Sequence, residues 1–136
     1  MPASVSRGRR NNNPGNIRIS SQKFQGEVQP SSDKAFKQFS TMDYGYRALI
    51  KVLQTYQDKY HLRTVRQMIT RWAPSGENDT AAYIRAVCRD TGYKPDDPID
   101  MHKRDAALKM ARAISKVECA GWHDTASAMR AFALID

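Results

Sequence analysis

Glu118 is the residue of this chain whose surroundings best suit acid chemistry. The helical apolar stripe that leads up to it consists of Leu108, Ala111, Ile114 and Val117, and the helix-breaking residues AGW follow at 120–122. An acid that cleaves a glycosidic bond must hold its proton until the bond oxygen accepts it, and apolar surroundings and a helix C-terminus favour that protonated state. The pattern therefore predicts a general acid at Glu118. The alternative from the residues alone is a surface Glu that pairs with Lys116 or Arg112.

Glu27 and two asparagines are candidates for the other groups that a glycosidase needs. Glu27 lies in a predicted hairpin, where it is either a second catalytic carboxylate or a solvated surface residue, and both interpretations stay open. Asn13 and Asn16 lie in the turn-forming run NNNPGN and could hydrogen-bond the amides of amino sugars, although turn chemistry also explains them.

The segment RWAPSGENDTAAYI (71–84) contributes three further candidates for substrate binding. Trp72 and Tyr83 could stack on sugar rings, and the alternative for each is packing in the core. Glu77 precedes a helix, where negative charge is stabilised, so it suits an anionic binding group or a base better than an acid. The remaining turn residues of the segment are explained by the end of one helix and the cap of the next.

The elements that must position these residues are mostly helices. Periodicities of the i, i+3, i+4, i+7 kind predict five of them, over 44–60, 63–73, 79–91, about 101–118 and 125–135. The expected N-caps are Thr64 (with Gln67 in a capping box), Asn78 or Asp79, Asp100, and Asp124 or Thr125. Gly92 is expected to end the third helix.

The N-terminal third is expected to differ from the rest. Residues 1–10 are rich in Ser, Gly and Arg and predict a flexible basic arm. Pro14–Gly15 suits a type II turn, and the stretches 17–20 and 35–40 predict the two strands of a hairpin or of a small irregular sheet. The expected fold class is therefore a mainly α (α+β) single domain over 11–136, with about five helices and one N-terminal β-hairpin.

Composition limits the partners and the compartment. The net charge of +8 over 136 residues favours an anionic partner such as nucleic acid, a membrane surface or the cell wall. No apolar run is long enough for a membrane span, and the basic N-terminus lacks the apolar core of a secretory signal, so we expect a protein made in the bacterial cytoplasm and delivered by another route. The two cysteines do not suggest a disulfide framework and the three histidines are far apart, so no metal site and no cofactor are expected.

Five motifs resemble those of cell-wall hydrolases. The stretch ARAISKVECAG (111–121) resembles the helix of lysozymes and lytic transglycosylases that ends in a catalytic Glu followed by small residues, although Cys119 departs from the expected Ser or Asn. The order NNNPGNIR, KFQGE, FKQF and YGYRALIKVLQTY is similar to glucosaminidase-type hydrolases. In those enzymes the Glu helix precedes the Asn-rich turn, so the resemblance implies a circularly permuted lysozyme-like fold. It also implies peptidoglycan as the substrate, with Glu118 as the acid and Glu27 near the place of the second carboxylate.

The blocks NNNPGNIR, GYRA and RWAPSGENDTAAYI resemble phage and prophage proteins, including virion structural proteins, from about residue 11 to residue 118. Two functions follow as expectations. The first is a monomeric peptidoglycan-cleaving glycosidase (muramidase, lytic transglycosylase or glucosaminidase) that acts at the cell wall or within the virion, with glycan strands and other virion proteins as partners. The second is a non-catalytic basic virion or DNA-binding protein that grips phosphates with RGRR (7–10) and the two following basic helices. No base-reading motif supports the second, and the sequence does not decide which bond is cut or whether water attacks it.

Overall fold

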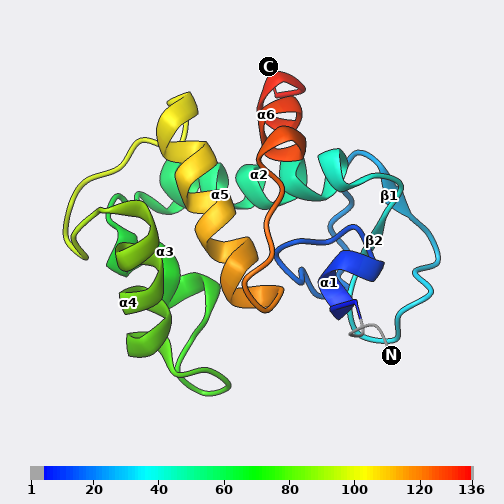
Figure 1. The fold of residues 1–136 in the computed structure, drawn as a ribbon, viewed down its shortest axis with the longest axis horizontal. Coiled ribbons are helices and arrows are strands. Elements are labelled where there is room, and N and C mark those ends of the chain that lie inside the picture. The colour runs from blue at the N-terminus through cyan, green and yellow to red at the C-terminus, as the bar shows by residue number, and fades with distance from the viewer. Residues whose placement is uncertain (1–4, 136) are drawn as a thin grey trace.

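The computed structural model describes residues 5–135, which form six helices and one two-stranded antiparallel sheet. In chain order the elements are α1 (Arg7–Arg10), β1 (Glu27–Val28), β2 (Gln38–Phe39), α2 (Met42–Tyr60), α3 (Val65–Trp72), α4 (Thr80–Thr91), α5 (Arg104–Glu118) and α6 (Thr125–Ala133). α2 crosses the middle of the molecule, and α1, β1 and β2 gather at the side where α2 begins (Figure 1). The prediction of a mainly helical chain with little strand is confirmed. No helix in the described part of the chain is long and apolar enough to cross a membrane.

α2 carries the centre of the hydrophobic core. The residues of its buried face lie one turn apart and are fully buried: Tyr46, Leu49, Ile50 and Leu53. α2 packs mainly on α6, and α5 packs on both α4 and α6. The Tyr46 hydroxyl donates to Ser115 Oγ of α5 at 2.9 Å and accepts from the backbone N–H of Asp124 at 2.9 Å. These contacts fix the end of α5 against α2 and so set the position of Glu118.

The helix boundaries follow local capping chemistry at most positions. Thr64 and Gln67 form the expected capping box at the start of α3. Asp79 caps α4 and Asp124 caps α6, each through its side chain, which decides between the alternatives that the sequence left open. Gly92 ends α4 in the left-handed conformation, as expected.

The predicted cap at Asp100 is wrong. α5 begins at Arg104, and Lys103 holds the N-cap position without a side-chain hydrogen bond. The Asp100 carboxylate instead accepts from Gln57 Nε2 of α2 at 2.9 Å and from the backbone N–H of His102 at 3.0 Å. Asp100 therefore ties the loop before α5 to α2.

The β region is smaller than the sequence predicts, and its pairing is different. The stretch 17–20 meets 35–40 only at an isolated antiparallel bridge between Arg18 and Phe36. The two-stranded ladder instead joins β2 to β1, which lies in the segment expected to form turns. Gly26, at φ 79°, bends the chain so that β1 can pair with β2.

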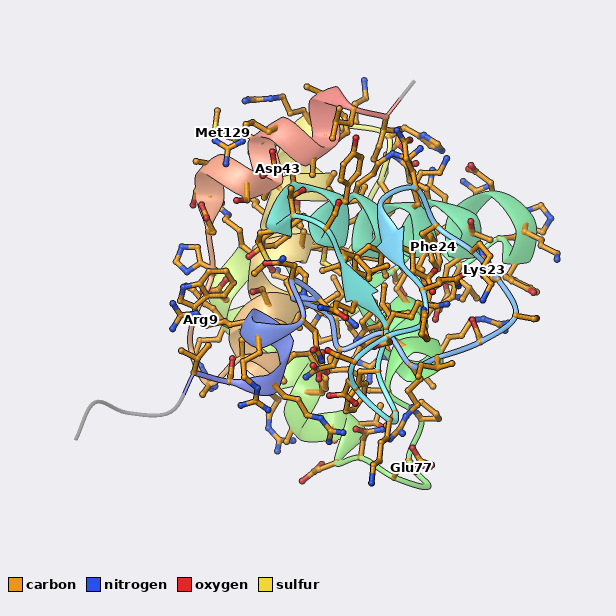
Figure 2. The ribbon with its side chains drawn as sticks, turned by 90° about the vertical axis from the view of Figure 1, so that its right-hand side faces the viewer. Arg9, Lys23, Phe24, Asp43, Glu77 and Met129 are labelled. Carbon is orange, nitrogen blue, oxygen red and sulfur yellow. The ribbon has the colours of Figure 1, made fainter. Side chains whose placement is uncertain are left out.

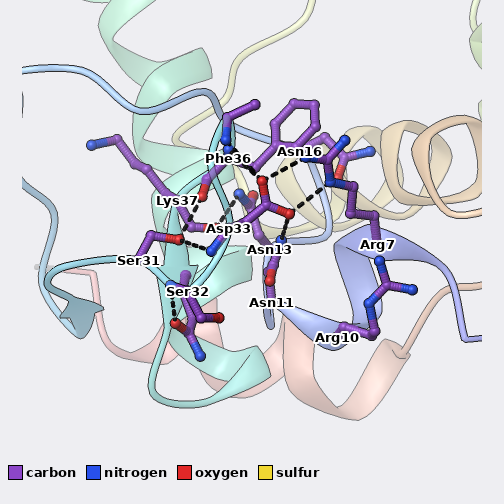
Figure 3. Close-up of polar contacts among 12 residues, drawn as sticks. Arg7, Arg10, Asn11, Asn13, Asn16, Ser31, Ser32, Asp33, Phe36 and Lys37 are labelled. Atoms are coloured by element: carbon purple, nitrogen blue, oxygen red, sulfur yellow. Dashed lines mark hydrogen bonds and ion pairs between the residues drawn. The ribbon is translucent and has the colours of Figure 1, made fainter.

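The N-terminal segment is docked where a flexible arm was expected. Residues 7–10 form α1, while residues 1–4 lie outside the described part of the chain. The Arg7 guanidinium donates to both oxygens of Asp33, at 2.6 and 2.7 Å, and Asn11 Nδ2 donates to the same carboxylate at 3.1 Å (Figure 3). The Arg7 guanidinium holds the pKa of Asp33 well below its usual range. This network fastens α1 to the loop that precedes β2.

Gly45→Ala should destabilise the protein strongly, because α2 and the Asn-rich turn touch at this residue. A Cβ at position 45 would overlap the backbone oxygen of Asn12 and approach Pro14 Cδ at 2.7 Å. Overpacking of this kind costs about 1–3 kcal/mol or more, and here the obstacle is backbone, which cannot move aside as a side chain does. The free energy of unfolding from urea denaturation tests this.

Gly76→Ala is the matched control, because its Cβ would meet no atom within 4 Å. Equal stabilities of the two variants would contradict the packing of the turn on α2.

Candidate functional site

Glu118 is the last residue of α5 and lines a cleft of about 360 Å³, a volume typical of sites for small ligands. The cleft is bounded on one side by the N-terminal region (Asn16, Arg18 and Phe36), on the other by the end of α3 and the loop after it (Trp72, Pro74 and Glu77), and along α2 by Val52 and Tyr56. Glu118 thus lies in a cleft between the N-terminal region and segment 71–84. Its side chain is half-buried.

A chain of hydrogen bonds from α3 and α4 holds one oxygen of Glu118. Trp72 Nε1 donates to the hydroxyl of Tyr83 at 3.1 Å, and this hydroxyl donates to Glu118 Oε2 at 2.8 Å. The direction is unambiguous, because the indole N–H can only donate and the phenol has a single proton. Burial, reinforced by the neighbouring Glu118, raises the pKa of Tyr83 far above 10. Tyr83 therefore remains a neutral donor at any physiological pH.

The second oxygen of Glu118 is held by the Asn-rich turn. Asn16 Nδ2 donates to Glu118 Oε1 at 3.1 Å and to the Glu118 backbone oxygen at 3.2 Å. The helix that ends at Glu118 therefore lies directly against the N-terminal turn. Asn16 reaches it because its own φ is +50°, a left-handed conformation that Asn tolerates. With both oxygens engaged, the carboxyl group has a defined orientation.

The turn itself differs from the expected type II turn. Asn16 N–H donates to the Asn13 oxygen at 3.0 Å around Pro14–Gly15, but the positive φ falls on Asn16 and not on Gly15. Gly15 serves a different purpose, because a Cβ there would lie 2.9 Å from the ring of Trp72. The absent side chain lets the indole pack on the turn and form the cleft wall.

Glu77 is the second carboxylate that lines the cleft. It lies at the tip of the loop between α3 and α4, at the edge of the molecule (Figure 2). Its side chain is 73% exposed, and its one ion pair among the described residues, with Arg18, is long at 3.6 Å. Glu77 is therefore free to approach a bound ligand, which fits the anionic binding group or base expected from its position before α4.

Glu27 does not reach this cleft. It lines a different depression, beside Ile19 and Pro30. Both of its oxygens are bound by Lys37 Nζ, at 3.1 and 3.2 Å, and the two side chains are only 6% and 1% exposed. Burial alone would raise the pKa of Glu27, but hydrogen bonds from Lys37, Gln29 and the Phe24 N–H outweigh it and lower the pKa. The structure thus places Glu27 in a buried ion pair.

Asn13 is also apart from the cleft. Its side chain is completely buried and its amide is fully used by the backbone, with Nδ2 donating to the oxygens of Ile17 and Lys37 and Oδ1 accepting from Ile17 N–H. Asn13 therefore holds the Asn-rich turn against β2. Of the seven candidates from the sequence, Asn16, Trp72, Glu77, Tyr83 and Glu118 converge on one place.

Three of the charged or aromatic residues that line the cleft are not among the candidates from the sequence. Arg18 lies in the stretch 17–20, Phe36 lies in the stretch 35–40, and Tyr56 lies in α2. Tyr56 stands at the edge of the apolar stripe of α2, which is the position where a helix passes from core to surface. The position of Tyr56 at this edge is the feature of the sequence that could have identified it as a cleft residue.

The arrangement can present one oriented carboxyl group, that of Glu118, to a ligand in the cleft, beside aromatic side chains and the exposed carboxylate of Glu77. No family model matches the chain. Over 91 residues, which make up 65% of this chain, the sequence is 43% identical to "Protein P5" of Pseudoalteromonas phage PM2. The chain spans 57% of that protein's length. The similarity shows that the chain is a homologue of a bacteriophage protein.

Proposed function

We propose that this protein cleaves the β-1,4 glycosidic bonds of peptidoglycan, with Glu118 as the general acid. The observation that carries the proposal is the carboxyl group of Glu118, oriented by Tyr83 and Asn16 at the wall of a cleft. A lysozyme-like fold, a site of action at the cell wall or within the virion, and other virion proteins as partners belong to the same proposal. The phage homologue is compatible with virion proteins as partners.

The chemistry begins with proton transfer from Glu118 to the glycosidic oxygen. The bond between that oxygen and the anomeric carbon then breaks, its electron pair stays on the leaving oxygen, and positive charge develops on the anomeric carbon and the ring oxygen. A water, the substrate's own hydroxyl or its N-acetyl group attacks the anomeric carbon. Where the N-acetyl oxygen attacks, water then opens the resulting oxazolinium ring. The attacking water or hydroxyl releases a proton, which reaches Glu118 directly or by way of Glu77 and so restores the acid.

The remaining residues of the cleft position the sugar and the acid. Tyr83 and Asn16 orient the carboxyl group, and each uses only one acceptor position of the oxygen it binds, so an oxygen of Glu118 can also carry the proton that is transferred. Trp72 lines the cleft, and its Nε1 donates to the Tyr83 hydroxyl and so fixes it. Glu27 and Asn13 have no part in this mechanism, because their polar atoms are committed to the fold.

Tyr83→Phe should lower kcat on solubilised glycan strands about tenfold with little change in KM. One hydrogen bond contributes about 1 kcal/mol, which corresponds to roughly this factor in rate, and the missing bond orients the acid without touching the sugar. Tyr93→Phe is the matched control, because Tyr93 lies outside the cleft. A rise in KM at unchanged kcat would contradict a positioning role for Tyr83.

The decisive experiment is the release of soluble fragments from purified peptidoglycan, with mass spectrometry of the products. Reducing ends at muramic acid or at glucosamine, or anhydro ends, identify the bond and the attacking group. If no fragments are released, the glycosidase proposal fails. The basic virion or DNA-binding function then takes its place, and its signature is DNA binding that weakens steeply with salt.

A further inference from the structure

A second depression continues the Glu118 cleft along α2. The two share Val52, Tyr56 and Pro74, and the second one, of about 700 Å³, extends to the end of α2 and the facing side of α3. Its other lining residues are Gln22, Thr55, Lys59, Tyr60, Thr70 and Arg71. A chain-like ligand that lies beside Glu118 therefore has a continuous path into this second depression.

The second depression is positively charged. It contains Lys59 and Arg71, and none of its described lining residues is acidic. Neither cation forms an ion pair with a carboxylate in the described part of the chain. Arg18 and Arg66, which line neighbouring depressions, each have a carboxylate partner.

Aromatic rings hold Arg71 in place without neutralising it. The centre of its guanidinium lies 3.7 Å from the centroid of the Tyr60 ring and 5.3 Å from that of Tyr56, and Lys59 Nζ lies 5.4 Å from the Tyr60 ring. Burial raises the pKa of Tyr56, so this phenol carries no charge to compensate Arg71. A stacked guanidinium keeps its N–H fork available in the plane of the group, which suits two-point binding of a carboxylate.

We propose that this second depression, with Arg71 and Lys59, binds a carboxylate of the acidic stem peptide of the glycan strand. The inference rests on the proposed function and deepens it, since it makes peptide-bearing peptidoglycan, and not bare glycan, the preferred substrate. Stem peptides branch from the amino-sugar backbone and carry free carboxylates, so a branch beside the cleaved bond can reach a neighbouring cationic pocket. A nucleic acid fits this path less well, because its phosphates would pass Glu77 and Glu118 in the adjoining cleft.

The test compares two substrates, intact glycan strands with their stem peptides and the same strands after an amidase has removed them. Arg71→Ala should lower kcat/KM on the peptide-bearing strands about tenfold, and the double variant Lys59→Ala/Arg71→Ala more, while both leave the rate on stripped strands unchanged. Arg71→Lys should recover only part of the loss, since Lys lacks the fork. Both residues are exposed, so these variants are expected to fold as the wild type does.

Arg89→Ala is the matched control. It removes one exposed positive charge from a depression between α4 and α5 that shares no residue with the two clefts. A loss as large as that of Arg71→Ala would mean general attraction to the wall, and equal losses on both substrates would mean contacts to the sugars, so either result overturns the stem-peptide site. If the wild-type protein cleaves peptide-bearing and stripped strands at equal rates, the stem-peptide site is also overturned, but the glycosidase proposal stays intact. A wild-type protein that cleaves neither overturns the proposed function and the inference together.

Discussion

Glu118→Gln should reduce the release of peptidoglycan fragments by about a hundredfold to ten-thousandfold, the range that a single general acid contributes. Gln has nearly the shape of Glu but no proton to give to the glycosidic oxygen. The fold should persist, because Gln can still accept the hydrogen bond from Asn16 or the one from Tyr83, and the side chain is only half-buried. Fragment release and a thermal melt of the same preparation measure the two quantities side by side.

Glu77→Gln is the matched comparison for this variant. It makes the same chemical change in the same cleft, on an exposed loop and without the two orienting donors. We expect a far smaller loss of rate from it. An active Glu118→Gln protein refutes the assignment of the acid, and a Glu118→Gln protein that fails to fold assigns the residue a structural role.

Glu27→Gln should have the largest effect on stability, a loss of about 3–5 kcal/mol in the free energy of unfolding. The substitution leaves the ammonium of Lys37, which is 1% exposed, without its charged partner. Lys37 would keep only neutral acceptors, which are the introduced amide oxygen and the backbone oxygens of Gln22 at 2.8 Å and Ser20 at 3.4 Å. Urea denaturation at neutral pH measures the change.

The double variant Glu27→Gln/Lys37→Met separates structure from catalysis. Removal of both charges should recover most of the lost stability, because no unpaired charge remains buried. If the recovered double variant cleaves peptidoglycan at the wild-type rate, Glu27 is structural. If it folds but is inactive, Glu27 is a catalytic carboxylate despite its distance from the cleft.

Acid should weaken the same ion pair in the wild type. The pKa of Glu27 is lower in the folded protein than its ordinary value of 4.5, so the unfolded chain takes up the proton first as the pH falls. The contribution of the pair is therefore complete above about pH 4.5 and is lost as the pH falls through the lower, folded pKa. The difference in stability between wild type and Glu27→Gln should shrink over that range. A difference that stays constant down to pH 3 would contradict the assigned pair.

Helices and most of their caps could be predicted from the sequence because they depend on neighbours within a few residues. The apolar stripe of α2 and the capping box at Thr64 are examples. The cap at Asp100 could not be predicted, since Gln57, 43 positions away, competes for the same carboxylate. The same limit applies to α1, whose position depends on the contact between Arg7 and Asp33.

The sequence by itself determined that Glu118 ends an amphipathic helix and that an Asn-rich turn and a Trp-bearing segment accompany it. Only the tertiary structure decided which of these meet. Asn16 and Tyr83 converge on Glu118 from 102 and 35 positions away, whereas Asn13, three residues before Asn16, turns inward. Glu27 and Glu77 have the same side chain, but one is neutralised by a buried lysine and the other stands open at the cleft. The reason is that a local pattern specifies which face of an element is buried, while the partner of a polar side chain depends on how distant elements pack.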